Sequence, residues 1–462
     1  MKKPWLLAAG LYLVATVCLM YGAWQGTGQL MLMDMPTANH RLLLAMSLLV
    51  AGGAIYGLNL TLGAGTWPAL MGGLFYLLNP YSIDRLWSGQ WRVLAGYAAA
   101  PVVVWLAVLA LRRGGRWWWV LALSYAVMPA ISQHWWLMLT LAGGPVLLTA
   151  AWRRGRFPWR HLLVSGLINL AWIVALRDES GVSQLQPADS TSFGAVATLP
   201  GGLPLTVLGL GGFWYHPFDF LPGIDYLWLM LVAGLLAASV LGWRLVVWRR
   251  RALAIVLAGC WFVVAGVIML SGWAPAQPVV QRVVATVPGL VGLRELTKLT
   301  GLLALGYATL APLGLTLWRF ERWAAVSGVA IIALAMAPAY GGGPYIKTYH
   351  FPSGWTEAKV YLDRQPQRRV VALPYAGYLV APWAGDRLVA NQAPGYFGHD
   401  VIAGSSTGNA DYDSRRGNSG SVTLADLTTL RPTHIVGAHY QQSDVESRGA
   451  DSGRLGDSGE QS

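Results

Sequence analysis

Residues able to do chemistry gather in three short stretches of an otherwise apolar chain. The first stretch, Leu32-Met33-Asp34-Met35-Pro36, places one carboxyl group among apolar neighbours. A carboxyl group in apolar surroundings holds a proton more readily than in water, which suits it to general-base work. A helix cap or an anchor at a membrane surface is the alternative role for Asp34, and the pattern alone leaves both open.

The second stretch runs from Asn79 to Arg92 and contains Asp84, Arg85, Gln90 and Trp91. Aromatic rings can stack on sugars, and Asp and Gln side chains can hydrogen-bond hydroxyl groups. The alternative is an aromatic belt at a membrane surface, with an exposed Asp84–Arg85 ion pair that contributes little. Such belts rarely carry Asp, Asn and Gln together, which favours a binding role.

The third stretch is Arg294-Glu295-Leu296-Thr297-Lys298. Arg294 and Lys298 are four residues apart at the start of an apolar helix, so they are expected on one helical face. Two cations near the positive end of a helix dipole favour an anion such as a lipid phosphate. The alternative is a pair of anchors that extend their charged ends to the membrane surface.

The composition shows which elements must position these stretches. Of the 462 residues, 55% are hydrophobic and 12% are charged, whereas soluble domains carry about 25% charged residues. This excludes an ordinary soluble protein, and the high hydrophobicity excludes a disordered chain. Eleven stretches are apolar enough to predict membrane spans: 4–24, 42–62, 65–80, 93–111, 117–132, 134–152, 160–176, 226–243, 252–271, 299–318 and 323–340.

The basic residues predict how the chain is oriented. With the N-terminus in the cytoplasm, fifteen Lys and Arg residues before residue 342 fall in cytoplasmic loops and seven in outer loops, as expected of a plasma (inner) membrane protein. The net charge of +12 therefore reflects topology and not a nucleic-acid surface. Eleven spans place the C-terminus and all three stretches on the extracytoplasmic side.

The chain is expected to have three parts. Residues 1–341 form an all-α polytopic membrane domain. Residues 342–440 form a small extracytoplasmic α/β region, with helices at 354–363 and 424–430 and strands at 369–373 and 434–436. Residues 441–462, rich in Ser, Gly and Asp, are expected to be disordered.

Few sequence features suggest a metal or a cofactor. The two cysteines, Cys18 and Cys260, lie far apart in apolar stretches, which gives no basis for a disulfide or a thiolate metal site. No metal-binding His/Cys spacing, phosphate-binding glycine loop or serine-hydrolase motif occurs. We therefore expect no cofactor. A divalent metal is the alternative, which the spacing does not support.

The three stretches resemble the GT-C superfamily of polytopic glycosyltransferases, in particular its arabinofuranosyltransferase-like and uncharacterised prokaryotic members. The resemblance rests on these segments: Asp34-Met35-Pro36; Asn79-Pro80-Tyr81, Asp84-Arg85-Leu86, Gly89-Gln90-Trp91 and Gly96-Tyr97; Arg294-Glu295, Lys298 and Leu305-Gly306-Tyr307; and Leu373-Pro374-Tyr375. It implies transfer of a sugar from a polyprenyl-phosphate donor to a glycan, lipid or protein acceptor on the extracytoplasmic face of the membrane.

The resemblance also implies roles for individual residues. Asp34 would deprotonate the acceptor hydroxyl, which attacks the anomeric carbon with inversion. Arg294 and Lys298 would offset charge on the leaving phosphate. Asp84, Arg85, Gln90, Trp91 and Glu295 would bind substrate. The first stretch lacks the adjacent acidic pair that would support a divalent metal.

Two other functions fit the same composition. One is a flippase or transporter of lipid-linked sugars, and the other is a non-catalytic envelope assembly protein. The predicted spans hold no charged residue near their middle, which counts against ion-coupled transport.

Overall fold

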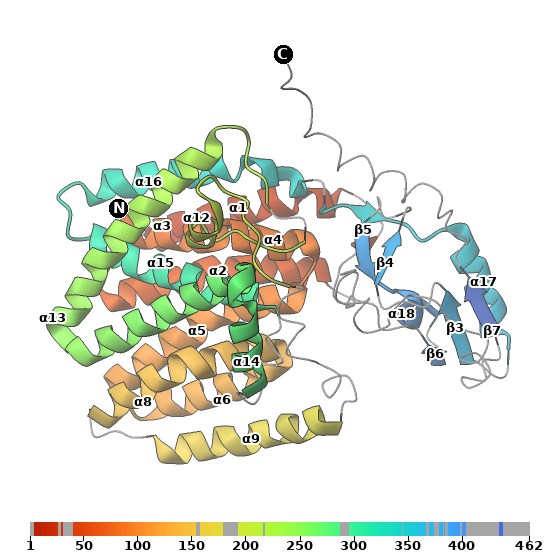
Figure 1. The fold of residues 1–462 in the computed structure, drawn as a ribbon, viewed down its shortest axis with the longest axis horizontal. Coiled ribbons are helices and arrows are strands. Elements are labelled where there is room, and N and C mark those ends of the chain that lie inside the picture. The colour runs from red at the N-terminus through yellow and green to blue at the C-terminus, as the bar shows by residue number, and fades with distance from the viewer. Residues whose placement is uncertain are drawn as a thin grey trace. The chain divides into compact units, whose positions relative to one another are not determined.

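The computed structural model of the chain forms two compact units, residues 1–348 and 349–462, shown in Figure 1. The structure describes residues 4–25, 29–30, 40–153, 158–178, 193–215, 218–286, 295–343, 345–365, 369–373, 378–381, 383, 387–397, 400–402 and 434–437. The predicted helix at 424–430 and the predicted tail at 441–462 lie outside these residues. The assignment of 342–440 and 441–462 as separate regions stays a prediction.

The first unit is mostly helical. Its larger elements are α1 (Pro4–Trp24), α2 (His40–Leu62), α3 (Thr66–Leu77), α4 (Pro80–Ser88), α5 (Trp91–Arg113), α6 (Arg116–Ile131), α7 (Gln133–Met138), the π-helix η1 (Leu139–Gly143), α8 (Gly144–Arg153), α9 (Trp159–Asp178), α13 (Ile224–Gly272), α15 (Thr300–Leu315) and α16 (Glu321–Ala335). The shorter elements are β1 (Gln29–Leu30), α12 (Gly202–Leu208), η2 (Ala274–Ala276), α14 (Gln277–Thr286), η4 (Leu296–Leu299) and η5 (Ala337–Gly342).

Each predicted span overlaps helical structure, but the match is not one to one. The spans 226–243 and 252–271 both lie in the continuous helix α13, and 134–152 is divided among α7, η1 and α8. Not every helix is long enough to cross a membrane. In the described part of the chain, seven helices are long and apolar enough, or eight if one bent pair is counted as a single span. The bent pair joins Trp261–Gly272 to Ala274–Val283 at 105°. The predicted spans 65–80 and 117–132 correspond to the shorter helices α3, of 12 residues, and α6, of 16 residues. The protein is therefore a multi-pass membrane protein. The number of eleven spans stays a prediction.

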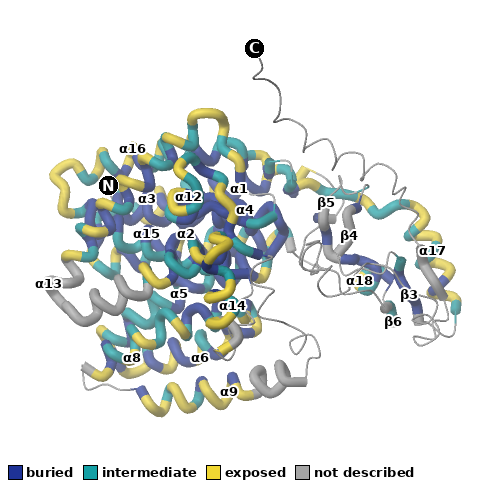
Figure 2. Tube along the Cα trace, viewed as in Figure 1, coloured by how far each residue is buried: buried dark blue, intermediate teal, exposed yellow. Residues whose placement is uncertain are grey.

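Burial separates central helices from peripheral ones. Figure 2 shows that much of α9 is exposed, whereas α3 and α4 are mostly buried. Leu163, Leu167 and Leu170 of α9 are 55%, 60% and 51% exposed. Because lipid is as apolar as these side chains, such exposure is expected of a helix at the edge of a membrane bundle.

The backbones of α13 and α15 approach each other at two glycines. A Cβ atom on Gly314 would lie 1.8 Å from the carbonyl oxygen of Ala238, and one on Gly242 would lie 2.1 Å from that of Leu310. Glycine is required at both positions because any side chain would occupy the neighbouring backbone. Small residues allow close helix packing in membranes, where the hydrophobic effect does not drive helices together.

We expect Gly314→Ala to separate α13 from α15 and to lower the thermal stability of the detergent-solubilised protein by at least several degrees. Overpacking typically costs about 1–3 kcal/mol, and a backbone neighbour gives way less easily than a side chain. Gly234→Ala, in α13, is the matched control because a Cβ there meets nothing within 4 Å. Equal melting temperatures for the two variants would contradict the packing described.

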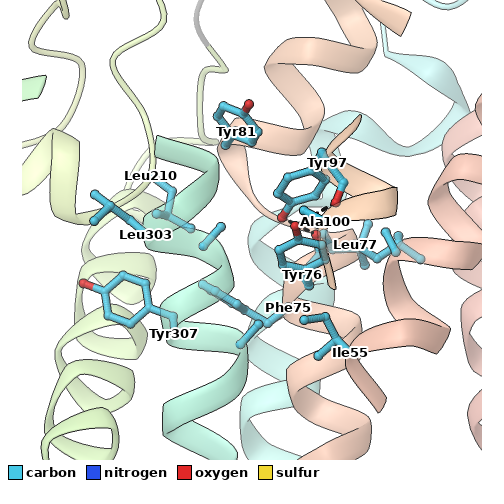
Figure 3. Packing of buried hydrophobic residues seen from close by; sticks show 14 of the residues in the cluster. Ile55, Phe75, Tyr76, Leu77, Tyr81, Tyr97, Ala100, Leu210, Leu303 and Tyr307 are labelled. Carbon is cyan, nitrogen blue, oxygen red and sulfur yellow. Dashed lines mark hydrogen bonds between the residues drawn. The ribbon is translucent and has the colours of Figure 1, made fainter. Parts of the chain in front are cut away.

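The turn between α3 and α4 is held by a buried polar network. The Asn79 side chain accepts a hydrogen bond from the Ser82 amide and Ser82 Oγ accepts one from the Asn79 amide, which forms a capping box. Tyr76 and Tyr97 stack at 3.9 Å, and each hydroxyl donates to the other's backbone carbonyl, as Figure 3 shows. Asn79 Nδ2 also donates to Tyr97 Oη at 3.0 Å. This network fixes the start of α4 against α5.

The second unit contains short strands and two helices. Strands β3 (Arg369–Leu373), β6 (Asp400–Ile402) and β7 (His434–Gly437) form a parallel sheet in the order β6-β3-β7, with Val371 opposite Ile402 and Ile435. Strands β4 (Tyr378–Ala381) and β5 (Arg387–Ala390) pair antiparallel. The helices are α17 (Ser353–Asp363) and α18 (Ala393–Phe397), and β2 (Thr348–Tyr349) lies where the units meet in sequence. The strands at 369–373 and 434–436 and the helix at 354–363 lie where the sequence predicts them.

Candidate functional site

The short helix α4 carries two charged side chains into the interior of the first unit. All nine of its residues are buried, and Asp84 and Arg85 are 2% and 1% exposed. The alternative in which they form an exposed ion pair is therefore wrong. Buried charges are costly unless they are paired and hydrogen-bonded, so their partners define the site.

Arg85 is the centre of a network that joins two segments distant in sequence. Its Nη1 pairs with Glu295 Oε1, 210 residues away, and donates to Gln90 Oε1 at 2.6 Å. Its Nη2 donates to Thr297 Oγ1 at 3.2 Å. The guanidinium group also lies 4.2 Å from the centre of the Phe213 ring, within the range of a cation–π contact.

Glu295 bridges Arg85 to a second cation. Its Oε2 lies 3.1 Å from Lys298 Nζ, which in turn lies 3.0 Å from His134 Nε2. Burial by itself would raise the pKa of Glu295, but the charges of Arg85 and Lys298 outweigh it and lower the pKa to about 2. Because this is below the ordinary value of 4.5, the carboxylate stabilises the fold above pH 4.5, and that contribution is lost as the pH falls toward 2.

The third stretch differs from the predicted regular helix. Residues Leu296–Leu299 form a 3-10 helix and α15 begins at Thr300, so Lys298 does not lie in the regular α-helix that the sequence predicts. Arg294 lies outside the described residues, and its position relative to Lys298 stays a prediction. The Lys298 side chain is 11% exposed and directed to Glu295 and His134. The alternative role as an anchor at the membrane surface is therefore wrong for Lys298.

Asp84 has a hydrogen-bond partner of its own, outside the network of Arg85, Glu295 and Lys298. Its Oδ1 accepts a hydrogen bond from the backbone N–H of Phe218 at 2.7 Å. Burial raises the pKa of Asp84 well above its ordinary value of 3.8, although the Phe218 amide and the Arg85 charge oppose the change. The structure thus gives Asp84 a role in holding the segment at 218 against α4.

We expect the Asp84→Asn variant to stay folded, because an amide oxygen can still accept from Phe218. Since the folded pKa of Asp84 is raised, the wild type binds an extra proton on folding, and its stability falls as the pH rises above about 4. The variant lacks this group, so its melting temperature, measured from pH 4 to 9, should vary less with pH. Identical pH profiles for the two proteins would contradict this assignment.

The structure brings together some of the predicted site residues. Arg85, Gln90, Glu295 and Lys298 form one network, and Asp84 adjoins it through α4. Trp91 is half-buried at the start of α5, with the Arg92 guanidinium 5.4 Å from its ring centre. Asp34 and Arg294 lie outside the described residues, so the predicted convergence of Asp34, Asp84, Arg294 and Lys298 stays a prediction.

Sequence reasoning missed four contributors to the site. His134, Thr297, Phe213 and the Phe218 amide all contact the charged residues. Thr297 lies within the third stretch, and His134 precedes Trp135 and Trp136, a pattern also typical of a membrane interface. The others are ordinary apolar residues whose role depends on contacts between distant segments.

The charges of the site favour an anion. Within the described ranges, no group of three or more His, Cys, Asp or Glu side chains could hold a metal ion. The network instead joins two cations, Arg85 and Lys298, to one carboxylate, Glu295, which leaves one positive charge in a buried setting. Guanidinium and ammonium groups are the usual ligands of phosphate in proteins.

The comparisons with known proteins bear on the fold of the chain. The cryo-EM structure of the arabinofuranosyltransferase AftD from Mycobacteria, a GT-C glycosyltransferase, matches with a TM-score of 0.52 and 15% sequence identity, covering 88% of this chain and 32% of AftD. A structure of an AftD mutant matches with a TM-score of 0.49, 15% identity and coverages of 88% and 33%. No family model and no curated protein matches the chain. The fold is therefore GT-C-like, and the chain spans 32% of the length of AftD.

Proposed function

We propose that the protein is an inverting membrane glycosyltransferase, which moves a pentosyl or hexosyl group from a polyprenyl-phosphate donor to a glycan, lipid or protein acceptor. The reaction takes place on the extracytoplasmic face of the plasma (inner) membrane. The N-terminus lies in the cytoplasm and the C-terminus outside. The GT-C-like fold over 88% of the chain supports this class of function.

The observation that carries the proposal is the buried pairing of Arg85 with Glu295 and of Glu295 with Lys298. It joins two of the three stretches in which sequence reasoning expected chemistry. A buried group of two cations and one carboxylate attracts an anion, and a phosphate leaving group needs such charge as the glycosidic bond breaks. The cationic cluster therefore suits the donor phosphate.

Asp34 acts as the general base in this proposal. It removes the proton from the acceptor hydroxyl, whose oxygen attacks the anomeric carbon from the face opposite the phosphate. The bond from the anomeric carbon to the phosphate oxygen breaks, and the electron pair leaves with polyprenyl phosphate. Arg294 and Lys298 stabilise that charge, while Asp84, Arg85, Gln90, Trp91 and Glu295 line or support the substrate site.

The direct test uses the purified protein in detergent or vesicles with a radiolabelled polyprenyl-phosphate sugar and an envelope extract as acceptor. We expect label to move from the prenyl lipid to the acceptor only when the protein is present. A panel of pentosyl and hexosyl donors identifies the sugar. Absence of transfer with every donor, from protein shown to be folded, would overturn the proposal.

A further inference from the structure

Several helix ends meet at one end of the first unit. The Arg112 side chain, in the last turn of α5, donates to the backbone carbonyl of Thr61, next to the last residue of α2. The Gly65 amide, in the turn after α2, donates to Thr316 Oγ1, directly after α15, at 2.9 Å. These hydrogen bonds hold the ends of α2, α5 and α15 together, although the residues that they join are 51 and 251 positions apart.

Aromatic contacts bring the starts of other helices to the same end. The guanidinium group of Arg322, in the first turn of α16, lies 5.0 Å from the centre of the Trp67 ring at the start of α3. The rings of Trp119, in the first turn of α6, and His161, in the first turn of α9, have centres 4.3 Å apart. We refer to the segments that these contacts join, residues 61–67, 111–119, 159–161 and 316–323, as the basic end.

The basic end carries an excess of positive charge. Its only acid is Glu321, and a Cβ atom placed on Gly65 would lie 2.7 Å from Glu321 Oε2, so this carboxylate is directed at the turn between α2 and α3. Its six arginines are all exposed: Arg112, Arg113, Arg116, Arg160, Arg319 and Arg322. Among the ion pairs of the described residues, none includes one of these arginines. Their charge therefore faces the surroundings of the protein.

Five of the six arginines lie beside aromatic rings, with guanidinium carbons 5.0 to 5.9 Å from the ring centres. The contacts are those of Arg113 and Arg116 with Trp117, Arg160 with Trp159, Arg319 with Phe320, and Arg322 with Trp67 and Trp323. A ring stabilises a nearby cation through its π-electrons, but it leaves the N–H donors in the plane of the guanidinium group. Those donors match two oxygens of one phosphate.

The aromatic rings of the basic end are also exposed. Trp159, Phe320 and Trp323 are 57%, 64% and 65% exposed. Tryptophan is enriched where a membrane meets water, with its ring at the level of the lipid headgroups. An arginine next to such a ring therefore lies at the level of the lipid phosphates, which favours a lipid over a soluble anion as the ligand.

Helix α3 separates the basic end from the buried cluster around Arg85. It begins at Thr66, within the basic end, and ends at Leu77, just before α4. Its 12 residues correspond to a length of about 18 Å. A headgroup bound at the basic end is therefore far from the network of Arg85, Glu295 and Lys298, and the two regions can be tested independently.

We propose that the basic end binds the headgroups of anionic phospholipids, and that Arg113 and Arg116, which contact the same ring of Trp117, form one of its phosphate contacts. Arginines near a membrane surface attract anionic lipids, and a zwitterionic headgroup lacks the net charge that they would neutralise. In the proposed orientation this end faces the cytoplasmic leaflet. The inference does not depend on sugar transfer.

The test measures lipid binding to the full-length protein in a neutral detergent by native mass spectrometry. The probes are dioleoyl phosphatidylglycerol and dioleoyl phosphatidylcholine, which share a phosphate and the same acyl chains but differ in net charge. We expect the wild type to bind phosphatidylglycerol at least about tenfold more tightly. Equal affinities for the two lipids would overturn the proposal and would leave the arginines a role only in orienting the chain in the membrane.

Substitutions then locate the binding surface. A variant that combines Arg113→Gln, Arg116→Gln, Arg319→Gln and Arg322→Gln should bind the two lipids within about twofold of each other, because most of the charge of the basic end is gone. All four side chains are exposed, so the variant should fold, and its melting temperature in phosphatidylcholine checks this. A variant that folds and keeps the tenfold preference would overturn the proposal.

Two single variants form a matched pair. Arg116→Gln should bind phosphatidylglycerol about fivefold more weakly than the wild type. Arg282→Gln removes the same charge from an exposed position in α14, outside the basic end, and its affinity should stay within twofold. Equal losses for the two variants would show that the preference follows the net charge of the whole protein, which would overturn the assignment to the basic end.

Discussion

Sugar transfer is expected to fall about a thousandfold when Asp34 is replaced by Asn. General-base catalysis contributes roughly 10²–10⁴-fold to rates, and an amide cannot accept the acceptor's proton. Because Asn has nearly the same size and still forms hydrogen bonds, substrate binding should change little. The single-turnover rate of transfer from a radiolabelled prenyl-phosphate sugar should fall, while the apparent KM for the donor stays within a few-fold of the wild type.

Asp225→Asn is the matched control for this experiment. Asp225 is in the first turn of α13, and its Oδ1 accepts a hydrogen bond from the neighbouring Tyr226 amide at 2.9 Å. The substitution is the same, but Asp225 has no part in the proposed reaction, so transfer should persist. If Asp34→Asn retains more than a tenth of the wild-type rate, Asp34 is not the base.

The Glu295→Leu variant is expected to lose roughly 3–5 kcal/mol of stability, the usual cost of leaving a buried charge without its partner. Glu295 is the counter-charge that the structure gives to both Arg85 and Lys298, so its removal leaves two cations together in the interior. The free energy of unfolding can be measured by titrating the purified protein with a denaturing detergent.

The Lys298→Met variant provides the comparison. It leaves Arg85 paired with Glu295 and adds no unpaired charge, so it should cost much less than Glu295→Leu. An equal cost for both variants would mean that side-chain volume, and not charge balance, determines the stability of the cluster.

Local patterns predicted the elements better than the contacts between them. The apolar stretch 4–24 corresponds to α1 at Pro4–Trp24, and 369–373 corresponds to β3 at Arg369–Leu373. Both depend on runs of neighbouring residues, which hydropathy and periodicity describe well. The number of spans was harder to predict, because a helix such as α6 is apolar along its length but only 16 residues long.

The contacts within the site could not be predicted from local sequence patterns. Asn79 followed by Pro80 is a typical start of a helix, so α4 itself could have been predicted. The burial of Asp84 and Arg85 could not have been predicted, because it depends on Glu295, Phe213 and Phe218 from distant parts of the chain. The dense mixture of charged, amide and aromatic residues from Asn79 to Arg92 coincides with a buried polar cluster, and the binding role expected of it stays a prediction.

The contact of backbone against backbone at Gly242 and Gly314 also bears on how a long hydrocarbon tail could travel. The two backbones are in direct contact there, which leaves no room for a methylene chain. An isoprenoid diffusing in the bilayer therefore cannot enter the protein between α13 and α15 at the depth of these glycines. At that depth, a lateral portal must open between a different pair of helices.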